Sequence, residues 1–142
     1  ELRNGYRISV ATASKILSNN LNYYKNVGLS LGTMICGWDL NGPSIYYVDD
    51  NASRYKSNLF SVGSGSTYAY GILDTLYNFN MNYEDAINLG KLAIFHATYR
   101  DAMSGGTVNV YHINEKGWEN IGAYNVSDLY EIYGNTQTYQ IN

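Results

Sequence analysis

A chain of 142 residues is of single-domain size, and with 45% hydrophobic residues it can bury a sizeable core. Its formal net charge is only -3, and its nine Lys and Arg residues form no run that could neutralise a row of phosphates, which excludes a nucleic-acid partner. No stretch is long and apolar enough to span a bilayer, and the first residues lack the pattern of a signal peptide, so we expect a soluble, cytosolic protein without a membrane partner.

The first third of the sequence predicts a helix followed by a hairpin. Ser9 can cap a helix in which apolar residues recur at three- and four-residue steps from residue 10 to about residue 26. An apolar run follows at 32–38, Asn41-Gly42-Pro43 predicts a turn, and 44–48 is a second run rich in Ile, Tyr and Val. The two runs therefore predict a β-hairpin.

The middle of the sequence predicts a strand and two helices. Residues 54–62 alternate imperfectly and lead into Gly63-Ser64-Gly65-Ser66, a small-residue turn at which the backbone must pass close to another part of the molecule. A helix follows at about 67–76. Asn82 can cap a longer helix over 83–101, with an acidic residue at the position of a capping box.

The last part predicts a second hairpin and a short helix. Residues 107–113 are rich in β-branched side chains and alternate, Glu115-Lys116-Gly117 predicts a turn, and 118–122 form the returning strand. A short helix is expected at 126–133. Residues 134–142 are polar, and we expect a loose tail there.

Together these elements predict an α+β fold. The antiparallel strands outnumber what the helices can cover on one face, which favours two stacked sheets flanked by helices. Such an architecture needs more strands than the sequence supplies, and there is no linker rich in Pro or Ser. We therefore expect residues 1–142 to form a single, incomplete domain.

The cysteine and the two histidines give no catalytic or metal-binding pattern. Cys36 lies in an apolar run, where we expect a small buried core residue. His96 and His112 lack the spacing to a second His, Cys or acid that a metal site needs. We expect both to be packing or surface residues, and we expect neither a metal nor a cofactor.

The C-terminal end of the long predicted helix carries the strongest chemical signal. Ala86, Gly90, Ile94 and Ala97 step along one side of this helix, and Asp101 is the next residue on that step. A carboxylate at a helix C-terminus is opposed by the helix dipole, by roughly 0.3–1 kcal/mol when exposed. Another group should therefore hold Asp101 in place.

Small residues close to Asp101 could supply such a group. Ser104 follows three residues later, and Gly105 and Gly106 allow the chain to turn and aim a hydroxyl and backbone N–H groups back at the carboxylate. Ser64, between two glycines, is either part of a plain turn or a hydroxyl that meets another site residue. The alternative for Asp101 is that it accepts hydrogen bonds only from its own turn.

Four separated motifs in this sequence resemble the proteasome beta subunits of the chymotrypsin-like type (type 5). They are RISVATASKILS at 7–18, LSLGTMICG at 29–37, SVGSGSTYAYG at 61–71, and YRDAMSGG at 99–106 with NVYH at 109–112. The similarity runs from Arg7 to about Tyr130. It implies the N-terminal-nucleophile hydrolase fold, a four-layer αββα sandwich, and would explain the missing strands.

The resemblance also implies a function, namely a threonine-type endopeptidase that cleaves unfolded polypeptides after bulky hydrophobic residues. Such subunits assemble with other proteasome alpha and beta subunits in stacked heptameric rings, in the cytoplasm and nucleus. A non-catalytic structural or assembly subunit of the same particle is the alternative. A small β-rich binding module, suggested only by the tyrosines, is a third reading.

The family's nucleophile is an N-terminal threonine whose own α-amine serves as the base. Here the first residue is Glu1, and Thr33 and Thr107, each preceded by glycine, lie inside predicted strands. We therefore expect the nucleophile to lie in a missing N-terminal piece and the printed chain to be inactive alone.

By resemblance, Asp101 and Ser104 lie beside that threonine and hold its amine and hydroxyl, with the Gly105 backbone close by. Ser64 completes the polar network. Met103 stands where the family more often has Tyr.

Overall fold

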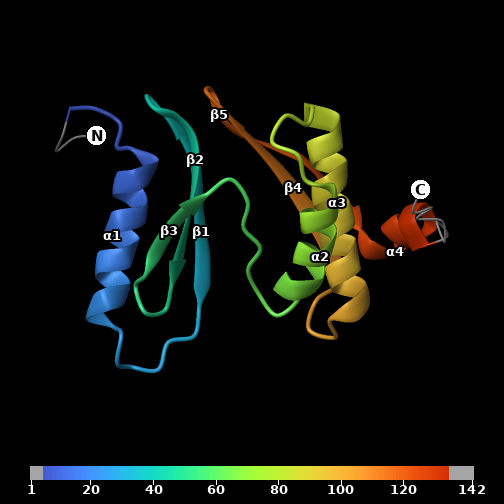
Figure 1. The fold of residues 1–142 in the computed structure, drawn as a ribbon, viewed down its shortest axis with the longest axis horizontal. Helices are drawn as coiled ribbons and strands as arrows, with labels where there is room; N and C mark the ends of the chain where they lie inside the picture. The colour runs from blue at the N-terminus through green and yellow to red at the C-terminus, as the bar shows by residue number, and fades with distance from the viewer. Residues whose placement is uncertain (1–4, 135–142) are drawn as a thin grey trace. The chain divides into compact units, whose positions relative to one another are not determined.

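The computed structural model of the chain describes residues 5–134 and contains both helices and strands, which confirms the predicted α+β class (Figure 1). No helix in this range is long and apolar enough to cross a bilayer. Of the segment 134–142, for which a loose tail is expected, only Gly134 lies within the described residues. The elements in chain order are α1 (Val10–Tyr23), β1 (Gly32–Asp39), β2 (Gly42–Asp49), β3 (Arg54–Ser57), α2 (Ser66–Leu76), α3 (Tyr83–Arg100), β4 (Thr107–Asn114), β5 (Gly117–Asn125), α4 (Val126–Leu129) and the π-helical turn η1 (Tyr130–Gly134).

The chain divides into two compact units, each described here by itself. The first unit comprises the residues up to Val62 together with 112–119. The second comprises 63–111 and the residues from Asn120 onward. The expectation of a single domain stays a prediction.

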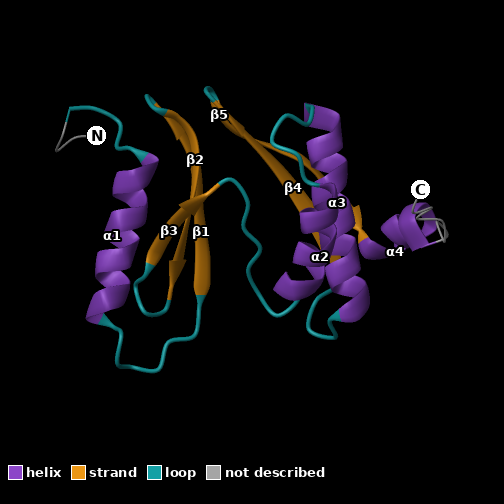
Figure 2. Ribbon diagram, in the orientation of Figure 1, coloured by secondary structure: helices purple, strands orange, loops and turns teal. Residues whose placement is uncertain are grey.

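In the first unit, α1 packs against a three-stranded antiparallel sheet of order β1-β2-β3 (Figure 2). The β1–β2 hairpin is longer than predicted because Gly42 and Pro43, expected in the turn, pair with β1. Gly42 has a φ of 91°, a left-handed conformation that glycine adopts without steric cost, and this lets the hairpin turn tightly. The strand predicted over 54–62 is confirmed only for 54–57.

Two acceptors hold the start of α1. The hydroxyl of Ser9 accepts a hydrogen bond from the backbone N–H of Thr12 at 3.0 Å, as the predicted cap requires. Asp39, at the end of β1, accepts one from the N–H of Val10 at 2.8 Å and so ties the hairpin to the helix. The helix ends at Tyr23, three residues before the predicted end.

The face of α1 that meets the sheet is built from small side chains. Ser14 and Ser18 are only 0% and 4% exposed, and the hydroxyl of Ser14 accepts a hydrogen bond from the guanidinium of Arg54 at 3.0 Å. On the sheet, a Cβ added to Gly37 would lie 2.7 Å from Cγ2 of Val10. The close approach of helix and sheet therefore depends on serine and glycine, which the apolar periodicity could not reveal.

The turn between β2 and β3 contains one residue in an unfavourable conformation. Ala52 has a φ of 63°, in the left-handed region that costs a non-glycine residue of order 1 kcal/mol or more. The hydroxyl of Ser18 donates to the carbonyl of Ala52 at 2.8 Å, and Asp49 accepts from the N–H of Ser53 at 2.7 Å. These hydrogen bonds hold the turn in place.

The face of the sheet opposite α1 carries exposed side chains. Because Gly37 faces α1, the alternation of β1 directs Met34 and Cys36 to the other face. Met34 is 42% exposed and Cys36 is exposed as well, so the expectation of a buried Cys36 is wrong. The burial that remains raises the pKa of the Cys36 thiol.

In the second unit, α2 and α3 lie side by side, and α3 shares a core with β4 and α4 (Figures 1 and 2). Phe95, Val108 and Leu129 are 3%, 4% and 1% exposed and come from α3, β4 and α4 respectively. The N–H of Val126 donates to the carbonyl of Gly106 at 3.0 Å, which fixes the start of α4 beside the start of β4. The predicted helix over 126–133 is divided into α4 and a π-helical turn.

The N-terminus of α3 is capped as predicted. The side-chain oxygen of Asn82 accepts a hydrogen bond from the backbone N–H of Asp85 at 2.9 Å. The side-chain amide of Asn82 in turn donates to the carboxylate of Asp85 at 2.8 Å. The reciprocal contact thus forms between the two side chains rather than through the backbone N–H of the cap.

Candidate active site

The candidate residues lie at the C-terminal end of α3 and in two loops of the second unit. Asp101 is the C-cap of α3, and its backbone N–H donates to the carbonyl of Ala97 at 2.8 Å. Ser104 follows in the loop before β4. Ser64 lies in the loop before α2, far away in the sequence.

The carboxylate of Asp101 is where these loops meet. Its Oδ2 accepts hydrogen bonds from the hydroxyls of both Ser64 and Ser104, each at 2.6 Å. Its Oδ1 accepts one from the backbone N–H of Met103 at 3.1 Å. The structure therefore brings Asp101, Ser104 and Ser64 together in one polar cluster.

The sequence left two interpretations open for Asp101, and the structure contains features of both. Ser104 and Met103 belong to the turn that follows the helix, as expected for an acid bonded to its own turn. Ser64 lies 37 positions away along the chain, so its hydroxyl makes a tertiary contact. The carboxylate thus joins the end of α3 to the start of α2.

The three hydrogen bonds also fix the charge of the cluster. The hydroxyl of Ser104, then that of Ser64, then the N–H of Met103 hold the pKa of Asp101 below its usual value, because each donor stabilises the ionised carboxylate. The helix dipole is unfavourable for an anion at this position, and the same donors compensate for it. Asp101 is therefore an ionised group at neutral pH.

The glycines of the cluster have different roles. Gly106 has a φ of 82° and allows the chain to turn into β4. Gly105 is exposed, and an added Cβ there would meet no heavy atom of the described chain within 4 Å. Gly65, which the sequence did not single out as a site residue, is buried against the end of α3. The expected backbone role of Gly105 stays a prediction.

The apolar stripe that pointed to Asp101 is not the buried face of α3. Of its four members, Ala97 is buried, whereas Ile94 is 44% exposed and Gly90 has open space beside it. The buried residues of α3 are Leu89, Ala93, Phe95 and Ala97. The reason is that the aromatic Phe95 enters the core and sets the face that turns inward.

Neither histidine is among the residues that hydrogen-bond to the Asp101 carboxylate. His112 pairs through Nδ1 with a carboxylate oxygen of Glu119 at 2.8 Å across the β4–β5 hairpin. Burial and the nearby Arg100 lower the pKa of His96. Within residues 5–134, no group of three or more His, Cys, Asp and Glu side chains is arranged to hold a metal ion.

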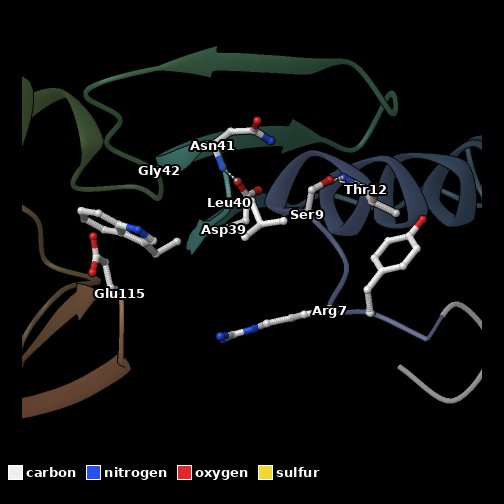
Figure 3. A pocket seen from close by; sticks show the side chains of 10 residues that line it. Arg7, Ser9, Thr12, Asp39, Leu40, Asn41, Gly42 and Glu115 are labelled. Carbon is white, nitrogen blue, oxygen red and sulfur yellow. Dashed lines mark hydrogen bonds between the residues drawn. The ribbon is translucent and has the colours of Figure 1, made fainter.

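A hollow of about 860 Å³ lies in the first unit, and none of the residues that line it is a candidate site residue (Figure 3). Asp39 lies in its wall, and hydrogen bonds from the backbone N–H groups of Val10 and Asn41 keep the pKa of Asp39 below its usual value. The carboxylate of Asp39 is therefore already hydrogen-bonded to the start of α1. The residues that line the hollow are Tyr6, Arg7, Ser9, Thr12, Trp38, Asp39, Leu40, Asn41, Gly42 and Glu115.

The Asp101 cluster can orient and attract a group that carries a proton to donate. Each serine hydroxyl uses its single proton on Oδ2, so the lone pairs of both hydroxyl oxygens stay available as acceptors. The cluster has one negative charge, which favours an ammonium group over a carboxylate. A serine that donates its proton in this way is an accepting partner and not an activated nucleophile.

Comparison with known proteins points in the same direction as the motifs. The family model described as Proteasome subunit matches residues 1–113. The chain is 54% identical over 132 residues to proteasome subunit beta type-8 of Homo sapiens, which covers 93% of this chain and 48% of that protein. It is 55% identical over 135 residues to proteasome subunit beta type-5 of Dictyostelium discoideum, and the match covers 95% of this chain and 50% of that protein. It is 51% identical over 134 residues to the beta type-5 subunit of Gallus gallus, and the match covers 94% of this chain and 52% of that protein. The chain thus spans about half the length of these relatives.

Proposed function

This chain belongs to the proteasome subunit family, and we propose that it is part of a core-particle beta subunit that is a threonine-type endopeptidase. Its similarity to beta type-8 and type-5 subunits supports this assignment. The family has the N-terminal-nucleophile hydrolase fold, which fits the α+β elements of the chain. The cleavage preference is for bonds after bulky hydrophobic residues.

The observation that carries the proposal is the Asp101 carboxylate with the hydroxyls of Ser64 and Ser104 on one oxygen. An N-terminal threonine needs its amine held close to its hydroxyl, because the amine takes the proton when the hydroxyl attacks the peptide carbonyl. An ionised carboxylate with two accepting hydroxyl oxygens beside it can hold the amine in this position. Gly105 completes the proposed site through its backbone.

The nucleophile itself is a threonine supplied by a segment outside these 142 residues. Thr33 is paired with Val48 in the β1–β2 hairpin, and Thr107 is the first residue of β4, directly before the buried Val108. Cleavage at either place would divide a hairpin or a core. The printed chain is accordingly inactive alone.

The subunit acts together with other alpha and beta subunits in stacked heptameric rings, on unfolded polypeptide substrates, in the cytoplasm and nucleus. The reaction needs no cofactor. The three supporting side chains of the proposed site all come from this chain.

Particles that carry the subunit with Asp101→Asn test this function. The amide has no negative charge, so cleavage after bulky hydrophobic residues should be abolished while the subunit is still incorporated. Asp74→Asn, at an exposed position of α2, is the matched control and should leave cleavage unchanged. Wild-type cleavage by the Asp101→Asn particle would refute the catalytic assignment and favour a structural or assembly subunit.

A further inference from the structure

Gly65 has a backbone conformation that any residue can adopt. Its φ and ψ are -81° and 6°, and it is the N-cap of α2. The nearby Gly63 is different, since its φ of 109° favours glycine for conformational reasons. The absence of a side chain at Gly65 therefore needs another explanation.

The explanation is steric and involves the Asp101 cluster. A Cβ added to Gly65 would lie 3.0 Å from Cβ of Ala97, 3.0 Å from Oγ of Ser104 and 3.3 Å from Oδ2 of Asp101. All three distances are shorter than ordinary van der Waals contacts. By contrast, a Cβ added to Gly71 on the same helix would meet no heavy atom of the described chain within 4 Å.

We propose that Gly65 is a positioning residue for the Asp101 cluster. Because it has no side chain, the loop before α2 can approach the last turn of α3 closely enough for Ser64 and Ser104 to reach the same oxygen of Asp101. This inference rests on the proposed function. Gly65 itself touches neither the nucleophile nor the substrate.

The contacts also indicate which group would move if a methyl were present. Ala97 is 5% exposed and its Cβ is fixed to the backbone of α3, so it cannot give way. The Ser104 hydroxyl lies in a loop and can rotate about χ1. A methyl at Gly65 should therefore displace the Ser104 hydroxyl first and leave Asp101 with one hydroxyl donor fewer.

Assembled particles that carry the full-length subunit with Gly65→Ala test the proposal. With turnover referred to the amount of incorporated subunit, kcat should fall at least about tenfold while KM stays within about twofold of wild type, because the substrate-binding groups are not moved. Gly71→Ala is the matched control and should leave both constants unchanged. Wild-type kcat in the Gly65→Ala particle would overturn the proposal.

A double-mutant cycle shows whether Gly65 acts through Ser104. If it does, Gly65→Ala combined with Ser104→Ala should be within about twofold of Ser104→Ala alone in kcat, because the hydroxyl that the methyl displaces is already absent. Fully additive losses would overturn the proposal. Asp101→Asn in parallel separates the two claims. Wild-type turnover in Asp101→Asn would refute the proposed function. Loss of turnover in Asp101→Asn together with wild-type turnover in Gly65→Ala would refute only the role of Gly65.

The Gly65→Ala subunit could fail to enter the particle, and a second variant covers that outcome. Adding Ala97→Gly removes the contact between the two Cβ atoms and keeps the contact with Ser104. This double variant should be incorporated with a reduced kcat. Failure of both variants to be incorporated, or a wild-type kcat in the double variant, would show that Gly65 serves only the packing of the helices.

Discussion

At the scale of single residues, the carboxylate of Asp101 combines three hydrogen bonds with an unfavourable position at the end of its helix. The acid lies at the negative end of the dipole of α3, yet three donors keep it ionised. Two of these donors are hydroxyls on the same oxygen. The arrangement should make the fold sensitive to protonation of this one carboxyl.

Asp101→Asn should therefore reduce the acid sensitivity of the fold. The pKa of Asp101 in the folded state lies below the value of about 3.9 expected for an unfolded chain. Such a group stabilises the fold above its unfolded-state pKa, and this contribution is lost as the pH falls through the lower, folded-state pKa. As the pH falls below about 4, the wild-type thermal midpoint should therefore fall more steeply than that of Asp101→Asn. Parallel curves for the two proteins would contradict this, and Asp74→Asn should follow the wild type.

The same Gly→Ala change should have opposite effects at two positions. At Gly37 the new methyl would meet Cγ2 of Val10 at 2.7 Å, so Gly37→Ala should lower the free energy of unfolding by about 1–3 kcal/mol. At Gly71 there is open space in a helix interior, so Gly71→Ala should raise it by about 0.5–1 kcal/mol. Urea denaturation of both variants measures the difference, and a change of the same sign in both would show that close contact does not decide the outcome.

Part of the candidate site could be predicted at this scale. A badly placed acid requires a partner, and this pointed from Asp101 to Ser104. The Gly-Ser-Gly turn left two interpretations open for Ser64, and only the family resemblance placed it in the same cluster. The small residues at 63–66 indicated a close approach of the backbone to another part of the molecule. That Gly65 lies against Ser104 and Asp101, and that the backbone N–H of Met103 donates to the carboxylate, could not be predicted, because residue type and spacing do not identify the partners. Whether the cluster supports a threonine stays a prediction.

At the scale of elements, the N-termini of α1 and α3 could be predicted from the sequence. Ser9 and Asn82 cap α1 and α3 as expected, because a side-chain oxygen before an apolar pattern has a local role that needs no tertiary contact. The buried face of α1 was not predictable. Ser14 and Ser18 are buried, and their hydroxyls are satisfied there by Arg54, by the Ala52 carbonyl and, for Ser14, also by the Ala11 carbonyl of its own helix.

Removal of the α3 cap should destabilise the fold without touching the chemistry. Asn82→Ala deletes an acceptor for the N–H of Asp85, and should lower the free energy of unfolding by about 1 kcal/mol. Asn88→Ala, at an exposed position of the same helix, should cost less. Because Asn82 lies at the opposite end of α3 from Asp101, turnover per incorporated subunit should be unchanged. A loss of turnover in Asn82→Ala would show that the two helix ends are coupled.

At the scale of the whole molecule, the chain divides into two compact units. The α+β class could be predicted from the alternation of helical and strand patterns. The extent of β3 could not, because the imperfect alternation over 54–62 continues past Ser57, where strand pairing ends. The exposed position of Cys36 was equally hidden, since an apolar run does not reveal which face of a sheet a helix will cover.

The core of the second unit depends on one aromatic side chain. Phe95 joins α3 to β4 and α4 and is 3% exposed, so Phe95→Ala should lower the free energy of unfolding by about 3–5 kcal/mol. Phe79→Ala, where the side chain is 72% exposed, is the matched control and should change it by less than about 1 kcal/mol. Hydrogen exchange should show α4 opening first in Phe95→Ala, because Leu129 packs on the same cluster. Equal destabilisation by the two variants would contradict this assignment of the core.

The turn at Ala52 has a consequence for the order in which the first unit folds. An alanine with a positive φ is locally frustrated, so this turn cannot nucleate the pairing of β2 with β3. Local hydrogen bonds between Asp49 and Ser53 support the turn, and the hydroxyl of Ser18 adds one to the Ala52 carbonyl once α1 has docked. The β1–β2 hairpin, with a glycine at its own turn, can form earlier. We therefore expect the third strand to pair last, and a glycine in place of Ala52 to let it join the sheet before the helix docks.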